Sequence, residues 1–184
     1  MRLANIVPAA ALVMVMSGSA FAQAEWAEFV DRADHFAVNF PGAPKVETIA
    51  YKTEKGTSLP AHVYTAQDSR GAYKLTVVDY HSAPAETATA IAEAAKIMRM
   101  KGEVKYDAQE HIDHIRSQRI SLIAPGGERR ILAEILTEGG RLYISEASVG
   151  VKAPPPAQFQ ASLQVLDDQG VRIRYKADGV TRER

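Results

Sequence analysis

Four consecutive residues, His111-Ile112-Asp113-His114, bring together side chains that bind transition metals. On a helix the two histidines would share one face, and two imidazoles beside a carboxylate could begin a zinc site. On a strand, His111 and Asp113 would share a face while His114 points to the other. The neighbouring sequence favours strand or loop and supplies no third or fourth ligand. We therefore expect solvated structural residues here, with a metal or hydrolytic site as the alternative if the sheet brings His62 or His81 close.

A second candidate is Asp79-Tyr80-His81-Ser82, which lies where the strand pattern gives way to a helix pattern. A serine next to a histidine could form a nucleophile and its base. However, no G-x-S-x-G motif and no oxyanion glycine surround Ser82. Serine is also a preferred residue at the N-terminal cap of a helix. We expect Ser82 to cap the helix that follows, and we expect no catalytic residue in this chain.

Two groups of cations could bind anions. The glycines of Pro125-Gly126-Gly127 precede arginines, but a strand rather than a helix follows, which predicts a hairpin turn and not a phosphate site. Arg172, Arg174 and Lys176 alternate with apolar residues and so form one cationic face of a predicted last strand. Such a face is commonly solvated and protects a strand from unwanted pairing. The functional alternative is a surface that binds the acidic surface of a partner.

The composition is that of an ordinary globular protein, with 46% hydrophobic and 24% charged residues and no cysteine. Without cysteine the chain has no disulfide, no thiolate metal site, no cysteine nucleophile and no cysteine-linked lipid anchor. Its 22 basic and 22 acidic residues leave no net charge that would attract nucleic acid. We expect no cofactor and no nucleic-acid partner.

Residues 1–22 have the organisation of a signal peptide. Arg2 is followed by the apolar run 9–16 and by small residues that end in Ala20-Phe21-Ala22, which fits the A-x-A cleavage rule. Polar residues, proline and glycine interrupt the run too often for a helix that spans a bilayer. We expect cleavage near Ala22 and a periplasmic or secreted mature chain. Residues 23–184 are then a single domain without a transmembrane span, and the polar tail 177–184 is expected to fray.

Most of the mature chain alternates apolar and polar residues with a period of two, which predicts strands, and the short loops favour antiparallel neighbours. Two segments have helical spacing instead. The first covers 82–102, with Gly102 as a left-handed stop, and the second covers 154–166, opened by three prolines. The predicted fold class is α+β, an antiparallel β-sheet flanked by two main helices. The expected strands cover residues 36–40, 45–53, 59–65, 73–79, 104–108, 119–124, 131–135, 142–144 and 171–175.

The segment Phe36-Ala-Val-Asn-Phe-Pro-Gly-Ala-Pro44 resembles the opening of PsbP-like domains, where F-x-V-x-F-P runs into a proline-containing turn. Phe159-Gln-Ala-Ser-Leu-Gln-Val-Leu166 is similar to the late helix of that superfamily. The resemblance covers residues 26–176 and implies an α/β/α sandwich around an antiparallel sheet. Members of this superfamily, among them photosynthetic extrinsic subunits and bacterial envelope proteins, mostly act as accessory or binding proteins. The chain also resembles small exported alphaproteobacterial proteins of unknown function.

We therefore expect an exported, non-enzymatic accessory protein that acts through contacts with another protein of the cell envelope. The first alternative is a metal-binding or hydrolytic protein centred on His111, Asp113 and His114. The second is a small-ligand carrier with a cleft between sheet and helix. Four tyrosines would line that cleft: Tyr64, Tyr73, Tyr80 and Tyr106. Trp26 and Phe29 follow the cleavage site and are expected to pack on the core rather than contact a partner.

Overall fold

The computed structural model describes residues 25–179, 181 and 182, and the expected signal peptide lies outside these residues. The described chain forms two antiparallel sheets, one of seven strands in the order β3-β4-β5-β9-β8-β7-β6 and one of three strands in the order β1-β2-β10. The strands are β1 (Trp26–Asp31), β2 (Phe36–Pro41), β3 (Lys45–Lys52), β4 (Ser58–Gln67), β5 (Gly71–Asp79), β6 (Glu103–Ile112), β7 (Ile115–Ile123), β8 (Arg129–Glu138), β9 (Arg141–Gly150) and β10 (Gln164–Val165).

The antiparallel pairing predicted from the short loops is confirmed in every strand pair of both sheets. Within the seven-stranded sheet, β3-β4-β5 and β6-β7-β8-β9 are two meanders that meet where β5 pairs with β9. Glycines at positive φ make two of the hairpin turns, Gly126-Gly127 and Gly139-Gly140. The predicted turn at Pro125-Gly126-Gly127 is therefore a hairpin turn between β7 and β8.

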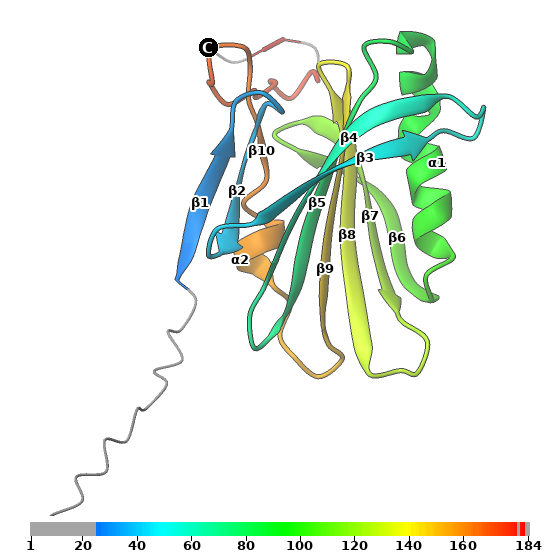
Figure 1. Cartoon of the computed structure of the whole chain (residues 1–184), viewed down its shortest axis with the longest axis vertical. Helices are drawn as coiled ribbons and strands as arrows, with labels where there is room; N and C mark the ends of the chain where they lie inside the picture. The colour runs from blue at the N-terminus through cyan, green and yellow to red at the C-terminus, as the bar shows by residue number, and fades with distance from the viewer. Residues whose placement is uncertain (1–24, 180, 183–184) are drawn as a thin grey trace, which may run out of the picture.

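Helix α1 (Thr87–Arg99) covers one face of the seven-stranded sheet (Figure 1). Its buried side is made of three alanines, Glu93 and Met98, and the alanines let the helix lie close over β7, β8 and β9. The helix begins later than predicted, because Pro84–Glu86 form a 3-10 turn before Thr87. Ser82 is exposed and makes no side-chain capping bond there, so the prediction that it caps the helix is wrong.

Gly102 follows α1 for a different reason from the predicted one. Its φ is not positive, so it is not a left-handed stop. A Cβ atom at this position would lie 2.1 Å from the carbonyl oxygen of Ile123 on β7. Glycine is therefore required because the chain between α1 and β6 passes directly against β7.

The opposite face of the seven-stranded sheet is covered by the small sheet β1-β2-β10, and not by a second main helix (Figure 1). The helix predicted at 154–166 is reduced to the single turn α2 (Ala157–Gln160). The chain then becomes β10, because the edge of β2 offers backbone hydrogen-bond partners that a longer helix would leave unused. The α+β class is correct but dominated by sheet, and the expectation of two main helices is wrong.

Two clusters of buried side chains lie on the two faces of the large sheet. One joins the small sheet and Phe159 of α2 to inward residues of β4, β5 and β9. The other lies between α1 and the opposite face. Trp26 and Phe29 belong to the first cluster, with the Trp26 ring centre 4.9 Å from that of Tyr73 and the Phe29 ring centre 5.7 Å from that of Tyr64. β1 is thus a packed strand of the domain.

Candidate functional site

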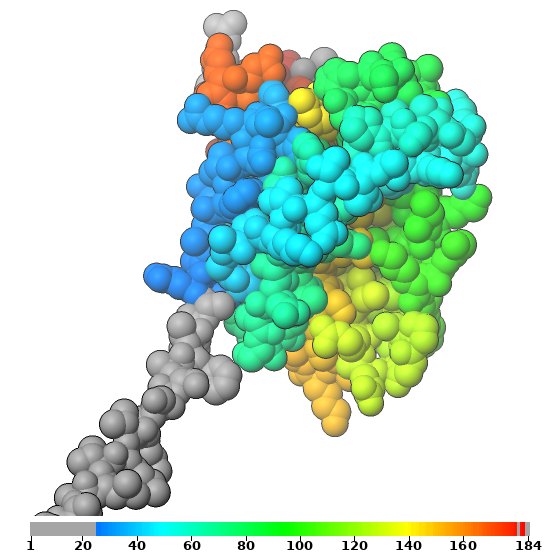
Figure 2. Space-filling model, viewed as in Figure 1, coloured from blue at the N-terminus to red at the C-terminus, as the bar shows by residue number. Residues whose placement is uncertain are grey.

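Two adjoining recesses lie at one end of the molecule, where the C-terminal segment 166–179, with residues 181 and 182, crosses the ends of the strands. In Figures 1 and 2 this end is at the top, where the orange C-terminal segment, the blue β1–β2 turn and the yellow β8–β9 turn come together. The arginine groove has a volume of about 830 Å³ and is lined by Asp167, Gln169, Val171, Arg172, Arg174, Thr181 and Arg182. The histidine recess has a volume of about 340 Å³ and is lined by His35, His81, Glu138, Gly139, Arg141, Tyr143, Val165, Leu166, Asp167, Asp168 and Ile173.

Asp167 forms the wall between the two recesses. One of its oxygens accepts hydrogen bonds from the backbone N–H groups of Gln169 and Val171, and the other lies 2.6 Å from an Arg182 nitrogen. The bond from Val171 contributes most to holding the pKa of Asp167 below its ordinary value, against a smaller opposing effect of burial. The carboxylate stays ionised, closes the turn that ends at Gly170 and fixes Arg182 at the rim of the groove.

The arginine groove contains two of the three cations that were predicted to form one face. Ile173 and Tyr175 turn toward the protein, with Ile173 only 7% exposed, while Arg172, Arg174 and Lys176 turn outward. The alternation is therefore as predicted, but the segment is not a strand of a sheet and makes only isolated bridges. Where fraying was expected, Lys176 donates a backbone hydrogen bond to Thr181 and Tyr175 forms a bridge with Arg182.

Asp113 contacts two of the arginines that line the groove, Arg172 and Arg174. It lies with His114 in the two-residue turn between β6 and β7, and both residues have positive φ, of 51° and 63°. The Asp113 carboxylate accepts two hydrogen bonds from Arg172, of 2.6 and 2.8 Å, and lies 3.8 Å from Arg174. Its backbone oxygen accepts a bond from the Tyr175 N–H. Asp113 thus anchors the C-terminal segment to the large sheet.

The predicted metal-binding residues are spread apart by this arrangement. His111 and His114 are exposed, and Asp113 is engaged by Arg172. His62 and His81 are bound to other aspartates, Asp34 and Asp79. Among residues 25–179, 181 and 182, no group of three or more histidines and carboxylates is close enough together to hold a metal ion. Metal binding by His111, Asp113 and His114 remains a prediction that metal analysis can test.

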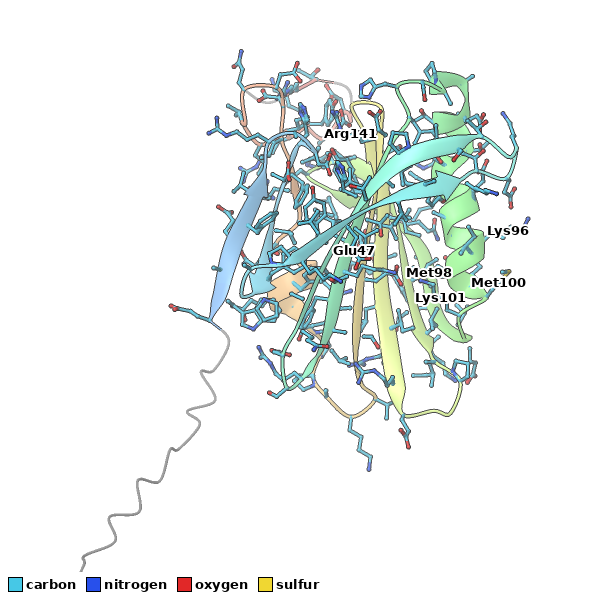
Figure 3. The ribbon with its side chains drawn as sticks, viewed as in Figure 1. Glu47, Lys96, Met98, Met100, Lys101 and Arg141 are labelled. Carbon is cyan, nitrogen blue, oxygen red and sulfur yellow. The ribbon has the colours of Figure 1, made fainter. Side chains whose placement is uncertain are left out.

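Three turns from separate parts of the chain build the histidine recess. The β1–β2 turn supplies His35, the β8–β9 hairpin supplies Glu138 and Arg141, and the end of β5 leads into His81. The turns are joined by backbone contacts, with Tyr80 N–H donating to the Gly140 oxygen and an Arg141 nitrogen donating to the Ala33 oxygen. Figure 3 shows Arg141 at this end of the molecule.

His81 is held by Asp79. Its ring Nδ1 lies 2.5 Å from an Asp79 oxygen, and its backbone N–H donates to the same oxygen. Burial by itself raises the pKa of Asp79, but the bonds from His81 and the positive charge of Arg141 outweigh it and hold that pKa below the ordinary value. A Cβ at Gly140 would lie 3.0 Å from Nε2 of His81, so glycine lets the imidazole lie directly over the hairpin. Ser82 is exposed, and in the described part of the chain no hydrogen bond joins it to His81.

His35 has a positive φ of 57°, a conformation that histidine adopts more readily than most residues. Its Nδ1 lies 3.3 Å from the Leu166 carbonyl oxygen and 3.7 Å from an Asp168 oxygen. The Leu166 backbone N–H donates in return to the His35 oxygen, and the Tyr143 hydroxyl donates to the backbone of the same turn. The β1–β2 turn is therefore locked to both β9 and the C-terminal segment.

A third histidine pair lies just outside the recess. Asp34 accepts hydrogen bonds from His62 Nδ1 at 2.7 Å and from the Tyr64 hydroxyl at 2.6 Å. Burial, followed by the contacts with Asp34 and Asp31, raises the pKa of Tyr64 above its ordinary value. Tyr64 therefore stays protonated and acts as a donor between the two sheets.

The cleft expected for a small-ligand carrier does not form from the predicted tyrosines. Tyr64 and Tyr73 lie in the cluster under the small sheet, Tyr80 lies in the cluster under α1, and Tyr106 is 46% exposed on β6. The residues that line the two recesses instead include His35, Glu138, Arg141, Asp168 and Arg182, none of which was selected from the sequence. No local motif marks the histidine recess, because segments more than 100 positions apart in the chain line it. The lining of the arginine groove comes from residues of one C-terminal segment.

No family model matches the chain, and no curated protein matches it. Among solved structures, the chain is similar to the solution structure of cyanobacterial PsbP (CyanoP) from Synechocystis sp. PCC 6803. The TM-score is 0.49 and the sequence identity 12%, over 82% of this chain and 98% of that chain. This is a distant likeness between two chains. We draw nothing about function from it.

None of the helices in the described residues is long and apolar enough to cross a membrane.

Proposed function

We propose that the protein is an exported, non-enzymatic accessory protein of the cell envelope that holds an acidic segment of a partner protein in the arginine groove. The observation that carries this proposal is the lining of the groove, where three arginines meet one carboxylate, Asp167, with Asp113 behind them. The groove volume of about 830 Å³ is in the range of sites that bind small ligands or short peptide segments.

Each arginine in the groove lies near a carboxylate of this protein, and part of its side chain remains exposed to a partner. Arg172 and Arg182 use part of their guanidinium groups on Asp113 and Asp167, while 31% and 42% of their side chains remain exposed. Arg174 lies farther from Asp113 and is 51% exposed. Because a guanidinium group has five N–H donors, each can bind a further carboxylate while keeping its internal partner. The internal partners reduce the side-chain entropy that binding would otherwise cost.

An apolar contact accompanies the charges. Val171 lines the groove, and its apolar side chain is 56% exposed. An acidic segment with an apolar residue would contact Val171 and pair with the arginines on either side. Such a combination favours a protein segment over a free inorganic anion, which would leave Val171 in water.

In-cell photocrosslinking of the mature protein tests the proposal. A crosslinking amino acid at Val171 should capture a partner, and the same amino acid at Val151, which is 38% exposed at the other end of β9, should not. Arg174→Glu should abolish the crosslink from position 171, because it places a carboxylate beside the acidic segment. Lys152→Glu makes the same change of charge at an exposed site away from the groove and should leave the crosslink intact.

Two results would contradict the proposal. One is equal crosslinking from positions 171 and 151 that Arg174→Glu does not change. The other is turnover of ester, phosphate or glycoside substrates by the purified protein, with activity lost on substitution of a single residue, which would overturn the non-enzymatic part.

A further inference from the structure

We infer that the histidine recess binds an organic cation, a primary ammonium or guanidinium group at the end of an aliphatic stem. The site is separate from the arginine groove except for their common wall at Asp167, and the inference does not depend on the proposed function. Four features carry it: the orientation of two imidazoles, the free carboxylate oxygens, the place of Arg141 and the apolar wall.

Both histidines use Nδ1 internally and leave Nε2 for a ligand. The Leu166 oxygen near His35 and the Asp79 carboxylate near His81 are acceptors, so Nδ1 of each ring carries a hydrogen and donates it to them. No hydrogen bond occupies Nε2 of His35 or Nε2 of His81 among the described residues. An imidazole whose only hydrogen is on Nδ1 accepts a hydrogen bond at Nε2, so two rings held in this way suit a ligand that donates hydrogen bonds.

The carboxylates of the recess add acceptors and negative charge. Glu138 accepts a bond from the Tyr175 hydroxyl at one oxygen, and no hydrogen bond occupies its other oxygen in the part of the chain described. Asp168 has a side chain that is 99% exposed at the rim and lies 3.7 Å from His35. Asp79 contributes further negative charge behind His81. A cation entering the recess can contact a carboxylate and an imidazole at the same time.

Among the described residues, Arg141 is the only lysine or arginine that lines the recess, and its guanidinium group is engaged by backbone oxygens rather than left free for an anion. Its guanidinium nitrogens contact the backbone oxygens of Ala33 and Gly139 at 3.3 and 3.4 Å, which ties the β1–β2 turn to the β8–β9 hairpin. It also lies close enough to Asp79 to lower the pKa of that carboxyl. Asp167 is paired with Arg182, but Glu138 and Asp168 still outnumber Arg141 in the lining, so the recess attracts positive charge.

The remaining wall is apolar. Val165, Leu166 and Ile173, all less than 10% exposed, line the recess together with Tyr143. A volume of about 340 Å³ accommodates a stem of several methylene groups with a charged head. Diamines, agmatine and the side chains of lysine and arginine share this chemistry.

Titration of the mature protein with cadaverine, followed by the ring resonances of its five histidines, tests the inference. We expect saturable shifts at His35 and His81 and none at His111, which is exposed on β6. The uncharged 1,5-pentanediol has the same length and should not bind. Agmatine should compete with cadaverine, because both heads use the same acceptors. N-acetyl-lysine methylamide carries a lysine side chain between two peptide groups. Its binding would indicate that the recess accepts a side chain of a peptide, and its failure to bind would indicate a site for free diamines.

Substitutions that keep the size of the side chain test whether cadaverine binds in the histidine recess. The double change Glu138→Gln and Asp168→Asn should raise the Kd for cadaverine about tenfold, since it removes two ion pairs near the protein surface. Glu128→Gln, in the exposed turn at the other end of β8, should leave the Kd unchanged. The inference is overturned if cadaverine and pentanediol bind alike, if the double variant binds as the parent does, or if acetate rather than cadaverine shifts His35 and His81.

Discussion

Gly102 and Asp79 show how single residues act in this molecule, one through the absence of a side chain and the other through its charge. Gly102 lets the chain leave α1 in direct contact with the Ile123 carbonyl on β7. Asp79 ends β5 and holds both the backbone and the ring of His81, so it decides where one imidazole of the histidine recess lies. Each residue makes a prediction that a single substitution can test.

Gly102→Ala should destabilise the protein by about 1–3 kcal/mol, because the new Cβ forces the α1–β6 connection away from β7. Gly150→Ala is the matched control, since a Cβ at Gly150 meets only the Ala153 side chain at 4.0 Å. Urea unfolding measures both changes. Equal stability of the two variants would show that the chain passes β7 with more room than the structure indicates.

Asp79→Asn should lower the free energy of unfolding at pH 7 by about 0.5–1.5 kcal/mol, the usual range for a hydrogen bond, because the Asp79 carboxylate accepts from the backbone N–H and the ring of His81. The pKa of Asp79 is lower in the folded than in the unfolded protein, so its ionised form contributes stability above about pH 4 that is lost as the pH falls through the folded-state value. The difference between Asp79→Asn and the parent should therefore disappear in acid. A difference that grows below pH 4 would contradict this assignment, and Glu128→Gln should show no difference at either pH.

At the scale of elements, the short α2 and the β6–β7 turn connect parts of the fold: α2 packs between the two sheets, and the turn binds the C-terminal segment. α2 is one turn, yet its Phe159 is fully buried, with its ring centre 5.4 Å from those of Phe40 and Tyr73. It joins the small sheet to the large one. The β6–β7 turn holds Asp113, which binds the C-terminal segment through Arg172. Both elements fix the position of the segment that borders the two recesses.

Phe159→Ala should cost about 3–5 kcal/mol, the range for removing a buried aromatic side chain. The neighbouring Gln158→Ala changes an exposed residue of the same turn and should stay within about 0.5 kcal/mol of the parent. Thermal or urea unfolding distinguishes the two. A small effect of Phe159→Ala would mean that the small sheet is held to the large one by other contacts.

Metal analysis tests the alternative site at the β6–β7 turn. We expect the purified protein to carry no stoichiometric zinc or copper, and added zinc to leave the melting temperature unchanged, because Arg172 occupies the Asp113 carboxylate. Bound metal that is lost in the His111→Ala and His114→Ala double variant would contradict this prediction and restore the metal-binding alternative.

At the scale of the whole molecule, the layers explain why the recesses lie where they do. α1, the seven-stranded sheet and the three-stranded sheet are stacked, and the C-terminal segment closes the end at which the small sheet meets the β8–β9 hairpin. That end collects three of the five histidines, each beside an aspartate. An exported accessory protein would present this end to a partner.

Export itself is tested by the mass of the mature protein. We expect the form recovered from the cell envelope to begin at Gln23, because Ala20-Phe21-Ala22 fits the cleavage rule. Arg2 is the only charge in the removed segment, so the mature chain has 21 basic and 22 acidic residues. Recovery of the uncleaved chain in the membrane fraction would contradict cleavage, and substitution of Ala22 by a bulky residue should slow processing.

The sequence by itself determined strands β2 to β9 and their antiparallel pairing, the helix α1, the hairpin at Gly126-Gly127 and the outward alternation of Arg172 and Arg174. These features depend on local periodicity and on turn residues, which neighbouring positions specify. Only the tertiary structure decided that a small sheet rather than a second helix covers the large sheet. It also decided that His35, His81, Glu138 and Asp168 share one recess. Contacts between segments far apart in the chain depend on packing and on backbone hydrogen bonds that no local pattern encodes.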